Sequence, residues 1–436
     1  MIQIIDKQNC CGCGACASSC PKRCIMMTED NEGFLYPRVD EESCINCGLC
    51  EKVCNELHPY EKHEPKQVFA AINKNEEIRL KSSSGGIFYI LAERIIREGG
   101  VVFGARFDER WQVVLDYAED LKGVSAFMGS KYVQARVEDA YIDARRFLLE
   151  GRKVLFSGTP CQVAGLHKFL RRSYEKLVTV DFICHGVPSP KVWGLYLDEV
   201  INRSQVLAKV EFRNKSRGWK NFGFRLRYND GDNTVSMLSP FWQNHYMKAF
   251  LQDITLRPSC YDCKAKGCSS LSDITIADFW GINTVFPEMD DDKGAGLVFI
   301  NTDKGKAALD FTQINVAETT YERIKPLNQA CYRSAKIPPK RKEFFGKLDN
   351  ENIIDLIDDC TKPSSRQQMI IMSHRCKSII QRVLRNIMGG GIIKDDNVVE
   401  SNGFNIHFSG NQRIVSIRFR CKDDGWKKYN MEVRLK

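Results

Sequence analysis

The densest feature of this chain is CCGCGACASSCP, at residues 10–21, which places five cysteines within twelve residues. A second dense stretch, CINCGLCEKVC, follows at residues 44–54. Both contain the spacing C-x2-C-x2-C-x3-C, by which bacterial ferredoxins bind two 4Fe–4S clusters. The cysteines in these positions are Cys10, Cys13, Cys16 and Cys20 in the first run, and Cys44, Cys47, Cys50 and Cys54 in the second.

In this arrangement the fourth cysteine of each run serves the cluster held by the other run. The exchange follows from geometry, because a tight loop can reach three irons of a cubane and the fourth iron needs a ligand from elsewhere. It also ties the two loops together. We therefore assign Cys10, Cys13, Cys16 and Cys54 to cluster one, and Cys44, Cys47, Cys50 and Cys20 to cluster two.

The alternative interpretation of these runs is a pair of zinc sites. Zinc sites usually combine two C-x2-C pairs separated by a longer loop, which two copies of a four-cysteine run match poorly. Cys11 and Cys24 are left over, and packing is their expected role. Asn55 stands where the first run has Pro21, and this difference removes no ligand.

The remaining composition agrees with a metalloprotein. The chain has 436 residues and 19 cysteines. We find no secretory signal at the N-terminus and no apolar run of the ~18–20 residues that a membrane span needs. A cytoplasmic protein keeps its thiols reduced, so this many cysteines indicate metal binding rather than disulfides.

The net charge of +9 is unevenly distributed. Residues 1–60 carry five basic and nine acidic side chains, a net charge of −4. Residues 361–436 carry 15 basic and six acidic side chains, a net charge of +9. The basic residues are not interleaved with aromatic side chains on which bases could stack, so we expect no nucleic-acid binding.

The middle of the chain indicates an α/β body. QVFAAIN, at residues 67–73, predicts a strand, and KSSSGGIFYILAERIIREGG follows as a helix with an apolar face. Its serines can cap the helix, and serine hydroxyls with glycine amides at a helix start also suit an anion such as a phosphate. A plain helix cap is the simpler alternative.

Two further segments each predict a strand, a turn and a helix. KVLFSGTPCQVAGLHKFL delivers Cys161 to the end of one strand, and VTVDFICHGVPSPKVWGLYL delivers Cys184 to the end of another. Strand ends are where open α/β sheets bind ligands. Cys260 and Cys263 form a C-x2-C pair that Cys161 and Cys184 would complete as a metal site, although Cys268 could replace one of them. A zinc site is the rival interpretation.

At this point the chain resembles a known family, the coenzyme F-420 (8-hydroxy-5-deazaflavin) hydrogenase/dehydrogenase beta subunits. The resemblance covers about residues 1–310 and rests on ordered blocks: SSSGGIF, FSGTPCQVAGL, DFICHGVPSP, FRNKSRGWKNFGF, SCYDC, SDITIADFWGI and DDDKGAGLVFINTDKG. It implies a body that binds FAD and a third 4Fe–4S cluster. The implied cluster ligands are Cys161, Cys184, Cys260 and Cys263, and the implied flavin contacts are Ser83, Ser84, Gly85, Gly86, Thr159 and Gln162.

Three residues within these blocks are further candidates. His185 follows a proposed cluster ligand and could donate a proton during reduction, because histidine titrates near neutrality. A structural histidine at a turn is an equal alternative. Asp278 and Trp280 follow a strand and are expected near the flavin, although they could instead close a core.

These observations predict an iron–sulfur flavoprotein oxidoreductase. FAD would exchange a hydride with an organic substrate, a deazaflavin or another acceptor, and the clusters would exchange single electrons with a redox partner protein or ferredoxin-type carrier. The alternative is a non-catalytic electron-transfer subunit that docks on a partner enzyme. A zinc-rich regulatory protein is a third class.

The predicted organisation has three parts. Residues 1–60 form a small α+β ferredoxin domain, residues 65–345 a mixed α/β flavin and iron–sulfur body, and residues 346–436 a basic extension. In the extension, residues 366–388 predict an amphipathic helix that packs on the protein or contacts a membrane surface. FNIHFSG and RIVSIRFRC predict two strands joined at Gly410 and Asn411.

Overall fold

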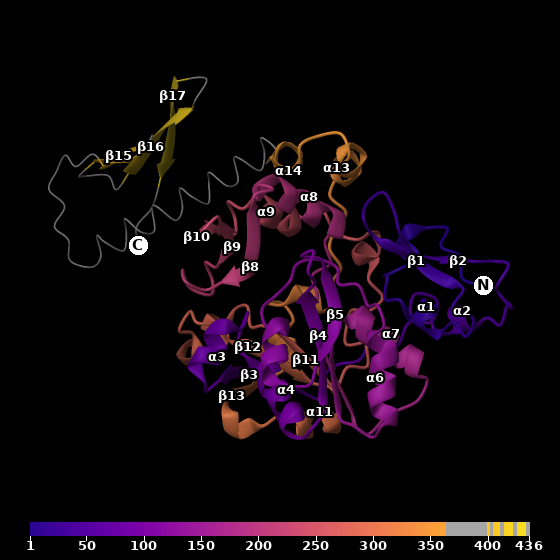
Figure 1. The fold of residues 1–436 in the computed structure, drawn as a ribbon. Helices are drawn as coiled ribbons and strands as arrows, with labels where there is room; N and C mark the ends of the chain where they lie inside the picture. The colour runs from indigo at the N-terminus through magenta and orange to yellow at the C-terminus, as the bar shows by residue number, and fades with distance from the viewer. Residues whose placement is uncertain (363–398, 402–403, 410–413, 422–424, 433–436) are drawn as a thin grey trace. The chain divides into compact units, whose positions relative to one another are not determined.

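The computed structural model of the chain describes residues 1–362, 399–401, 404–409, 414–421 and 425–432 (Figure 1). The chain divides into two compact units, Met1–Thr361 and Lys362–Lys436. The predicted boundaries at residues 60 and 345 lie inside the first unit and stay predictions.

The N-terminal segment of the first unit is a small α+β structure. Its two strands, β1 (Ile25–Glu29) and β2 (Leu35–Val39), pair antiparallel. Its short helices, α1 (Ala15–Ser19) and α2 (Leu49–Lys52), each begin after a glycine in the left-handed conformation. These glycines, Gly14 with φ 72° and Gly48 with φ 69°, let the chain turn sharply inside each cysteine run.

The body of the first unit is built on a mixed sheet of eight strands in the order β13-β3-β12-β11-β7-β6-β4-β5. Strands β4, β6, β7 and β11 run parallel, and the other neighbouring pairs are antiparallel. This mixed sheet confirms the predicted fold class. The bounds are β3 (Gln67–Asn73), β4 (Val101–Phe107), β5 (Val113–Ala118), β6 (Val154–Ser157), β7 (Leu177–Phe182), β11 (Ile274–Asp278), β12 (Gly296–Ile300) and β13 (Ile314–Thr319).

Successive side chains along each strand point to opposite faces of the sheet, and each face is covered by an apolar layer. Val102 of β4 packs on the same face as α4, whereas Val101 and Phe103 face the layer that contains α6 and α7. The helices of the first unit, besides α1 and α2, are α3 (Glu76–Lys81), α4 (Ile87–Arg97), α5 (Leu121–Val124), α6 (Ala140–Leu149), α7 (Pro160–Leu170), α8 (Pro190–Val200), α9 (His245–Leu251), α10 (Ile282–Val285), α11 (Asp303–Ala308), α12 (Tyr321–Ile324), α13 (Arg341–Lys347) and α14 (Ile353–Thr361).

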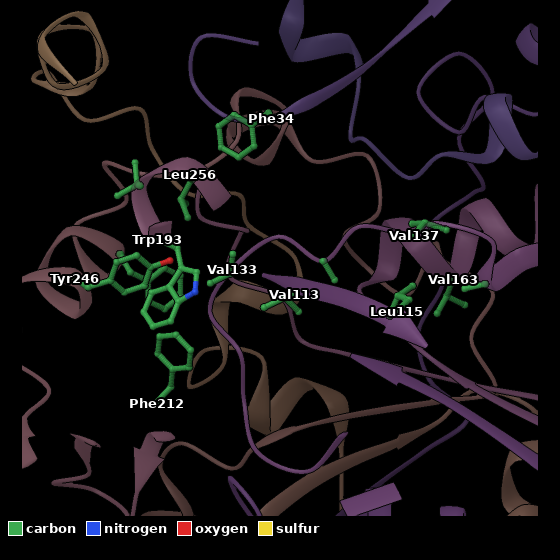
Figure 2. Close-up of a cluster of buried hydrophobic side chains, with 14 of the residues drawn as sticks. Phe34, Val113, Leu115, Val133, Val137, Val163, Trp193, Phe212, Tyr246 and Leu256 are labelled. Carbon is green, nitrogen blue, oxygen red and sulfur yellow. The ribbon is translucent and has the colours of Figure 1, made fainter. Parts of the chain in front are cut away.

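A second, antiparallel sheet of the body consists of β8 (Gln205–Asn214), β9 (Gly223–Asp230) and β10 (Asn233–Pro240). Figure 2 shows the core beneath it, where Trp193, Phe212 and Tyr246 cluster. Phe34, from the loop before β2, belongs to the same buried cluster. The ferredoxin-like segment therefore shares a hydrophobic core with the body.

The serines before α4 do not cap that helix, so the predicted cap is wrong. The N-cap residue of α4 is Gly86, in the left-handed conformation with φ 81°, and it provides no side-chain cap. Ser82 instead ends α3, where its hydroxyl donates to the carbonyl of Ile78 at 2.8 Å. The turn between the two helices needs the glycine conformation and leaves the serines to the preceding helix and to neighbouring loops.

The described part of the second unit is a four-stranded antiparallel sheet: β14 (Val399–Ser401), β15 (Phe404–Ser409), β16 (Ile414–Cys421) and β17 (Gly425–Glu432). Strands β15 and β16 pair antiparallel, which confirms the two predicted strands. The turn at Gly410 and Asn411, and the predicted helix over 366–388 with its membrane contact, lie outside the described residues. Within the described ranges, no helix has the length and apolar character needed to cross a membrane.

Candidate iron–sulfur and flavin site

The four cysteines assigned to cluster one gather from both runs. The pKa of the Cys16 thiol is raised to about 12, mainly by burial and in addition by the neighbouring thiols Cys10 and Cys54. Cys54, the last cysteine of the second run, therefore lies beside the first run, as the exchange of ligands requires. Cys10 and Cys16 are buried, and Cys13 and Cys54 are partly buried.

The four cysteines assigned to cluster two gather in the same way. Cys20, from the first run, lines one small cavity together with Cys44, Cys47 and Cys50 of the second run. The backbone N–H of Ile2 donates to the Cys50 sulfur at 3.3 Å. Cys47 is exposed, so this site is more open to solvent than the first, whose four cysteines are buried or partly buried.

Cys24 lies at the edge of the second site, with its sulfur 3.4 Å from that of Cys20. The hydrogen bond that it shares with Cys20 raises the pKa of the Cys24 thiol to about 11, with burial as the next cause. Sequence spacing had indicated packing alone for this residue.

The third predicted set comes from three separate parts of the body. Cys161 lies in the first turn of α7, Cys184 follows β7, and Cys260 and Cys263 lie in and after the short helix Pro258–Asp262. The pKa of Cys184 is raised to about 12, mainly by burial, and the neighbouring Cys161 and Cys263 thiols contribute to this rise. Burial likewise raises the pKa of Cys260, with Cys184 and Cys263 adding to it. The fold thus brings all four thiols together.

Cys268 lies apart from this group. Burial raises its pKa to about 12, and the neighbours that add to it are Asp181, Cys331 and Glu64. In the part of the chain that the structure describes, no group of three or more His, Cys, Asp or Glu side chains is placed to hold a single metal ion. A cubane spreads its thiolates over four irons, so its ligands stand farther apart than those of one ion.

Cys11 lies between the ferredoxin-like segment and the body. It is buried, and hydrogen bonding between the Cys11 and Cys161 side chains is the first cause that raises the pKa of Cys161. The same thiol also hydrogen-bonds Cys13, a predicted ligand of cluster one. Cys11 therefore joins a ligand of cluster one to a ligand of the body site, a position that no sequence spacing could reveal.

A cavity of about 700 Å³ opens at the carboxyl ends of the parallel strands. This volume is within the range of cofactor and ligand sites, and the location is the one at which open α/β sheets bind ligands. Every predicted flavin residue lines it, and so do the predicted proton donor and one cluster ligand. They are Ser83, Ser84, Gly85, Gly86, Thr159, Gln162, Cys184, His185 and Asp278.

Several of these side chains are held by the protein itself. Thr159 and Gln162 form a reciprocal cap at the start of α7, and the Gln162 amide also donates to the carbonyl of Ala135 at 3.1 Å. Ser83 accepts hydrogen bonds from the backbone N–H and the hydroxyl of Ser130. Gly85 passes so close to the backbone of β3 that a Cβ there would lie 2.3 Å from the carbonyl oxygen of Ala71. These contacts shape the cavity wall and leave backbone groups facing the cavity.

Asp278 is the acceptor of a buried polar network. Arg213 donates to its carboxylate at 2.5 Å, and the indole N–H of Trp219 donates at 3.1 Å. Trp219 stacks on Trp280, with ring centroids 5.1 Å apart. Trp280 itself lines the cavity. The network therefore fixes one wall of the cavity and keeps an aromatic ring in it.

His185 is held by a carboxylate. Its Nε2 lies in close contact with Asp253, and its ring packs edge-on against Phe250 at 5.5 Å. The side chain is 43% exposed. A histidine that is oriented by an acid and open to the cavity can hold a proton there.

Sequence reasoning missed two lysines of the cavity wall, Lys131 and Lys220. Lys131 donates to the carbonyls of Met128 and Gly129 at 3.3 Å each, and it forms no ion pair with any described residue. Desolvation lowers its pKa to about 7. Lys220 also lines the cavity but is paired with Asp290. Nothing in the sequence around Lys131 or Lys220 distinguishes them from the other lysines of the chain, so sequence reasoning had no signal for either.

Two cysteine-rich loops spaced for cubanes, joined to an α/β body with a large cavity at its strand ends, define an iron–sulfur protein with a ligand-binding body. Residues 9–56 match the model of the 4Fe-4S dicluster domain, and residues 151–323 match that of the C-terminal part of the coenzyme F420 hydrogenase/dehydrogenase beta subunit. The chain thus joins a 4Fe-4S dicluster domain to a domain of that beta-subunit family, which confirms the resemblance seen in the sequence. The dicluster match identifies an iron–sulfur protein, and its body is similar to the C-terminal part of that beta subunit.

Among solved structures, the chain is similar to one chain of the structure described as "Xenon derivatization of the F420-reducing [NiFe] hydrogenase complex from Methanosarcina barkeri". The identity is 19%, the match covers 68% of this chain and 91% of that chain, and the TM-score is 0.42. A likeness of this size supports no argument about the present chain. A comparison with curated proteins finds no match.

Proposed function

We propose that the protein is a flavin-dependent iron–sulfur oxidoreductase, with two 4Fe–4S clusters in residues 1–60, a third in the body and one FAD in the cavity. The observation that carries this proposal is Cys184. It belongs to the group of four body thiols, and it also lines the cavity that holds every predicted flavin residue. A flavin in that cavity would lie against a ligand of the third cluster. When bound, FAD exchanges a hydride with an organic substrate, and it exchanges electrons singly with iron–sulfur clusters.

Different residues of the cavity would bind the cofactor phosphates and hold the proton. The turn at Ser83–Gly86 presents hydroxyls and backbone amides to the cavity, and Lys131 adds a cation without a carboxylate partner among the described residues. Together they suit the anionic phosphates of the cofactor. His185, oriented by Asp253, would hold the proton that accompanies hydride exchange.

The arrangement of thiols supports an electron route from the cavity to the surface. Cys11 connects Cys161 of the body set to Cys13 of cluster one, and cluster two follows within the same ferredoxin-like segment. The surface near cluster two exposes Cys47 and Ile45, the latter 58% exposed. Exposed acidic side chains at Asp40, Glu41 and Glu42 flank it. We infer that a redox carrier protein with a basic rim docks there.

The substrate would be a deazaflavin or another organic hydride acceptor, and the protein would act in the cytoplasm, where cluster thiols stay reduced. The second candidate is a non-catalytic electron-transfer subunit that docks on a partner enzyme. It is favoured by the buried contact between cluster one and the body thiols, because that contact would serve electron transfer even without a flavin.

Iron, zinc and flavin content after oxygen-free purification distinguishes these candidates. The flavoenzyme should contain about 12 irons and about one FAD per chain, because each cubane holds four irons. Iron without flavin would favour the electron-transfer subunit. Zinc in place of iron would overturn both.

Flavin affinity should fall as the pH rises above about 7. The Lys131 ammonium has its pKa lowered to about 7 by desolvation, so the cation that faces the cofactor phosphates is lost above that pH. Quenching of flavin fluorescence on binding, measured between pH 6 and 9, gives the dissociation constant. The matched variant Lys131→Met should bind about tenfold more weakly at pH 6, in line with the loss of a charged hydrogen bond, and should show no such dependence. A variant that keeps the wild-type pH profile would exclude Lys131 from the phosphate site.

A further inference from the structure

The Arg257 side chain is a buried cation placed directly at cluster one. Its exposed fraction is 0%. It comes from the body, one residue before the short helix Pro258–Asp262, yet most of its partners lie in the ferredoxin-like segment. Its Nε donates to the carbonyl of Cys10 at 2.7 Å, and its Nη2 donates to the carbonyl of Leu35 at 2.9 Å. The same Nη2 lies 3.6 Å from the Cys10 sulfur, a predicted ligand of cluster one.

No carboxylate of the described residues forms an ion pair with this guanidinium, and the charge of Glu56 acts on it from a longer distance. Its Nη1 bonds the amide oxygen of Gln134 at 3.0 Å, and its plane stacks on the ring of Tyr36, with the guanidinium carbon 4.3 Å from the centroid. Its partners are therefore neutral groups and one thiol. An arginine keeps its charge in proteins, and a buried charge is costly unless a counter-charge lies near it. The thiolate of Cys10 and the cluster that it would bind supply that counter-charge.

Arg257 is also close to the body thiols. The backbone N–H of Cys260, a predicted ligand of the third cluster, donates to the carbonyl of Arg257 at 2.9 Å. One residue thus ties the loop that carries Cys260 to the loop that carries Cys10. Glu56 is the acid that faces the same thiols, because its charge acts on both Cys10 and Cys54.

The surroundings of cluster two are different. Its cavity is lined by Lys22, which is exposed, and by Met1, whose terminal ammonium pairs with Glu51, and Cys47 is open to solvent. Water screens a charge at the surface, whereas a buried charge acts through a low effective dielectric. Cluster potentials depend on net charge, on hydrogen bonds to the sulfurs and on solvent exposure, and all three differ between the two sites.

We infer that Arg257 is a positioning residue that raises the reduction potential of cluster one above that of cluster two. An electron that enters at the surface would then reside on cluster one, the cluster next to the body. The step is a transfer of one electron, in which cluster two is oxidised as cluster one is reduced, and no bond or proton changes place. The added negative charge is stabilised by the adjacent guanidinium. This inference rests on the proposed assignment of Cys10 to cluster one.

Redox titration of the whole, iron-loaded protein, followed by electron paramagnetic resonance, tests the inference. In Arg257→Gln, the ratio of reduced to oxidised cluster one at a fixed poise should fall about tenfold, which is ~59 mV for a one-electron couple. The reduction potential of cluster two should stay unchanged. Its signal is identified because a soluble lanthanide complex relaxes the cluster near the surface faster than the buried one.

Two further variants separate charge from structure. Arg257→Lys keeps the cation and should retain most of the wild-type potential. The Nη2 of Arg341 donates to the Oε2 of Glu32 at 2.6 Å, which forms another ion pair between the body and the ferredoxin-like segment. The double variant Glu32→Gln/Arg341→Gln removes this pair without changing the net charge. It should leave the reduction potentials of both clusters unchanged. If Arg257→Gln binds no cluster one, the Arg257→Lys variant decides the question. A reduction potential near that of the wild type supports the inference. A tenfold fall in the ratio of reduced to oxidised cluster one contradicts it.

Three results would overturn the inference while leaving the proposed function intact. They are an unchanged cluster one potential in Arg257→Gln, an equal fall in the Lys variant, and an equal fall in the interface double variant. A wild-type protein without 4Fe–4S signals would instead remove the proposed function itself.

Discussion

Replacing Cys161 by serine should remove about four of the ~12 irons per chain, because a cubane that loses one thiolate ligand is no longer held by the protein. The eight irons of the ferredoxin-like segment should remain, since their ligands lie in residues 10–54. Flavin should still bind, because Cys161 itself does not line the cavity. Iron and flavin assays on protein purified without oxygen give both numbers.

The control for this experiment is Cys268→Ser. Cys268 is another body cysteine shielded from solvent, yet its neighbours are Cys331 and Asp181, so its loss should leave the iron content unchanged. Cys11 needs a variant of its own, because its thiol hydrogen-bonds Cys161 and could replace it as a ligand. The double variant Cys11→Ser/Cys161→Ser removes that substitute. Full iron in the double variant would show that the body holds no third cluster on Cys161.

Replacing Asp278 by alanine should lower the free energy of unfolding of the protein by about 3–5 kcal/mol, the usual cost of leaving one charge of a buried pair without its partner. The side chains of Arg213 and Asp278 are only 4% and 16% exposed. The alanine variant leaves the guanidinium of Arg213 unpaired and removes the acceptor of the Trp219 indole N–H. The midpoint of urea unfolding, followed by tryptophan fluorescence, measures the change.

A matched exposed pair provides the control. Lys81 and Glu77 are 62% and 73% exposed and lie four residues apart on α3, so Glu77→Ala should leave the urea midpoint nearly unchanged. The double variant Arg213→Met/Asp278→Ala removes the unpaired charge and should recover a large part of the stability. If Asp278→Ala costs no more than Glu77→Ala, the buried pair does not hold this wall of the cavity.

Flavin binding by the same variants separates two roles of Asp278. If the carboxylate only supports the wall, the double variant should regain flavin binding together with stability. If the carboxylate contacts the cofactor, flavin binding should stay lost in the double variant although the stability returns. The dissociation constant of FAD for each variant gives the answer.

Many of the candidate site residues could be predicted because they follow short sequence patterns with a fixed spacing. The two cysteine runs predict which residues serve each cluster, since a tight loop can reach only three irons of a cubane. The cysteines Cys161 and Cys184 were found from sequence because strand ends meet at one edge of a sheet. The turn residues Ser83–Gly86 were found from the hydroxyls and amides at a helix start and from the family resemblance. The structure places the turn residues and Cys184 around one cavity.

Local sequence could not decide whether the serines at residues 82–84 cap helix α4. Ser82 is equally suited to end one helix or to begin the next, and the left-handed conformation of Gly86 decides between them. That choice depends on the backbone of the neighbouring strand, which passes within contact distance of Gly85.

The sequence by itself determined that this chain carries ferredoxin-type cluster loops ahead of an α/β body, because ligand spacing and strand periodicity are local properties. Only the tertiary structure decided how the two parts meet. Cys11 lies 150 positions before Cys161, and Arg257 lies 247 positions after Cys10, yet each pair is in contact. Such contacts arise from the packing of a shared core around Phe34, and no local pattern in the chain encodes them.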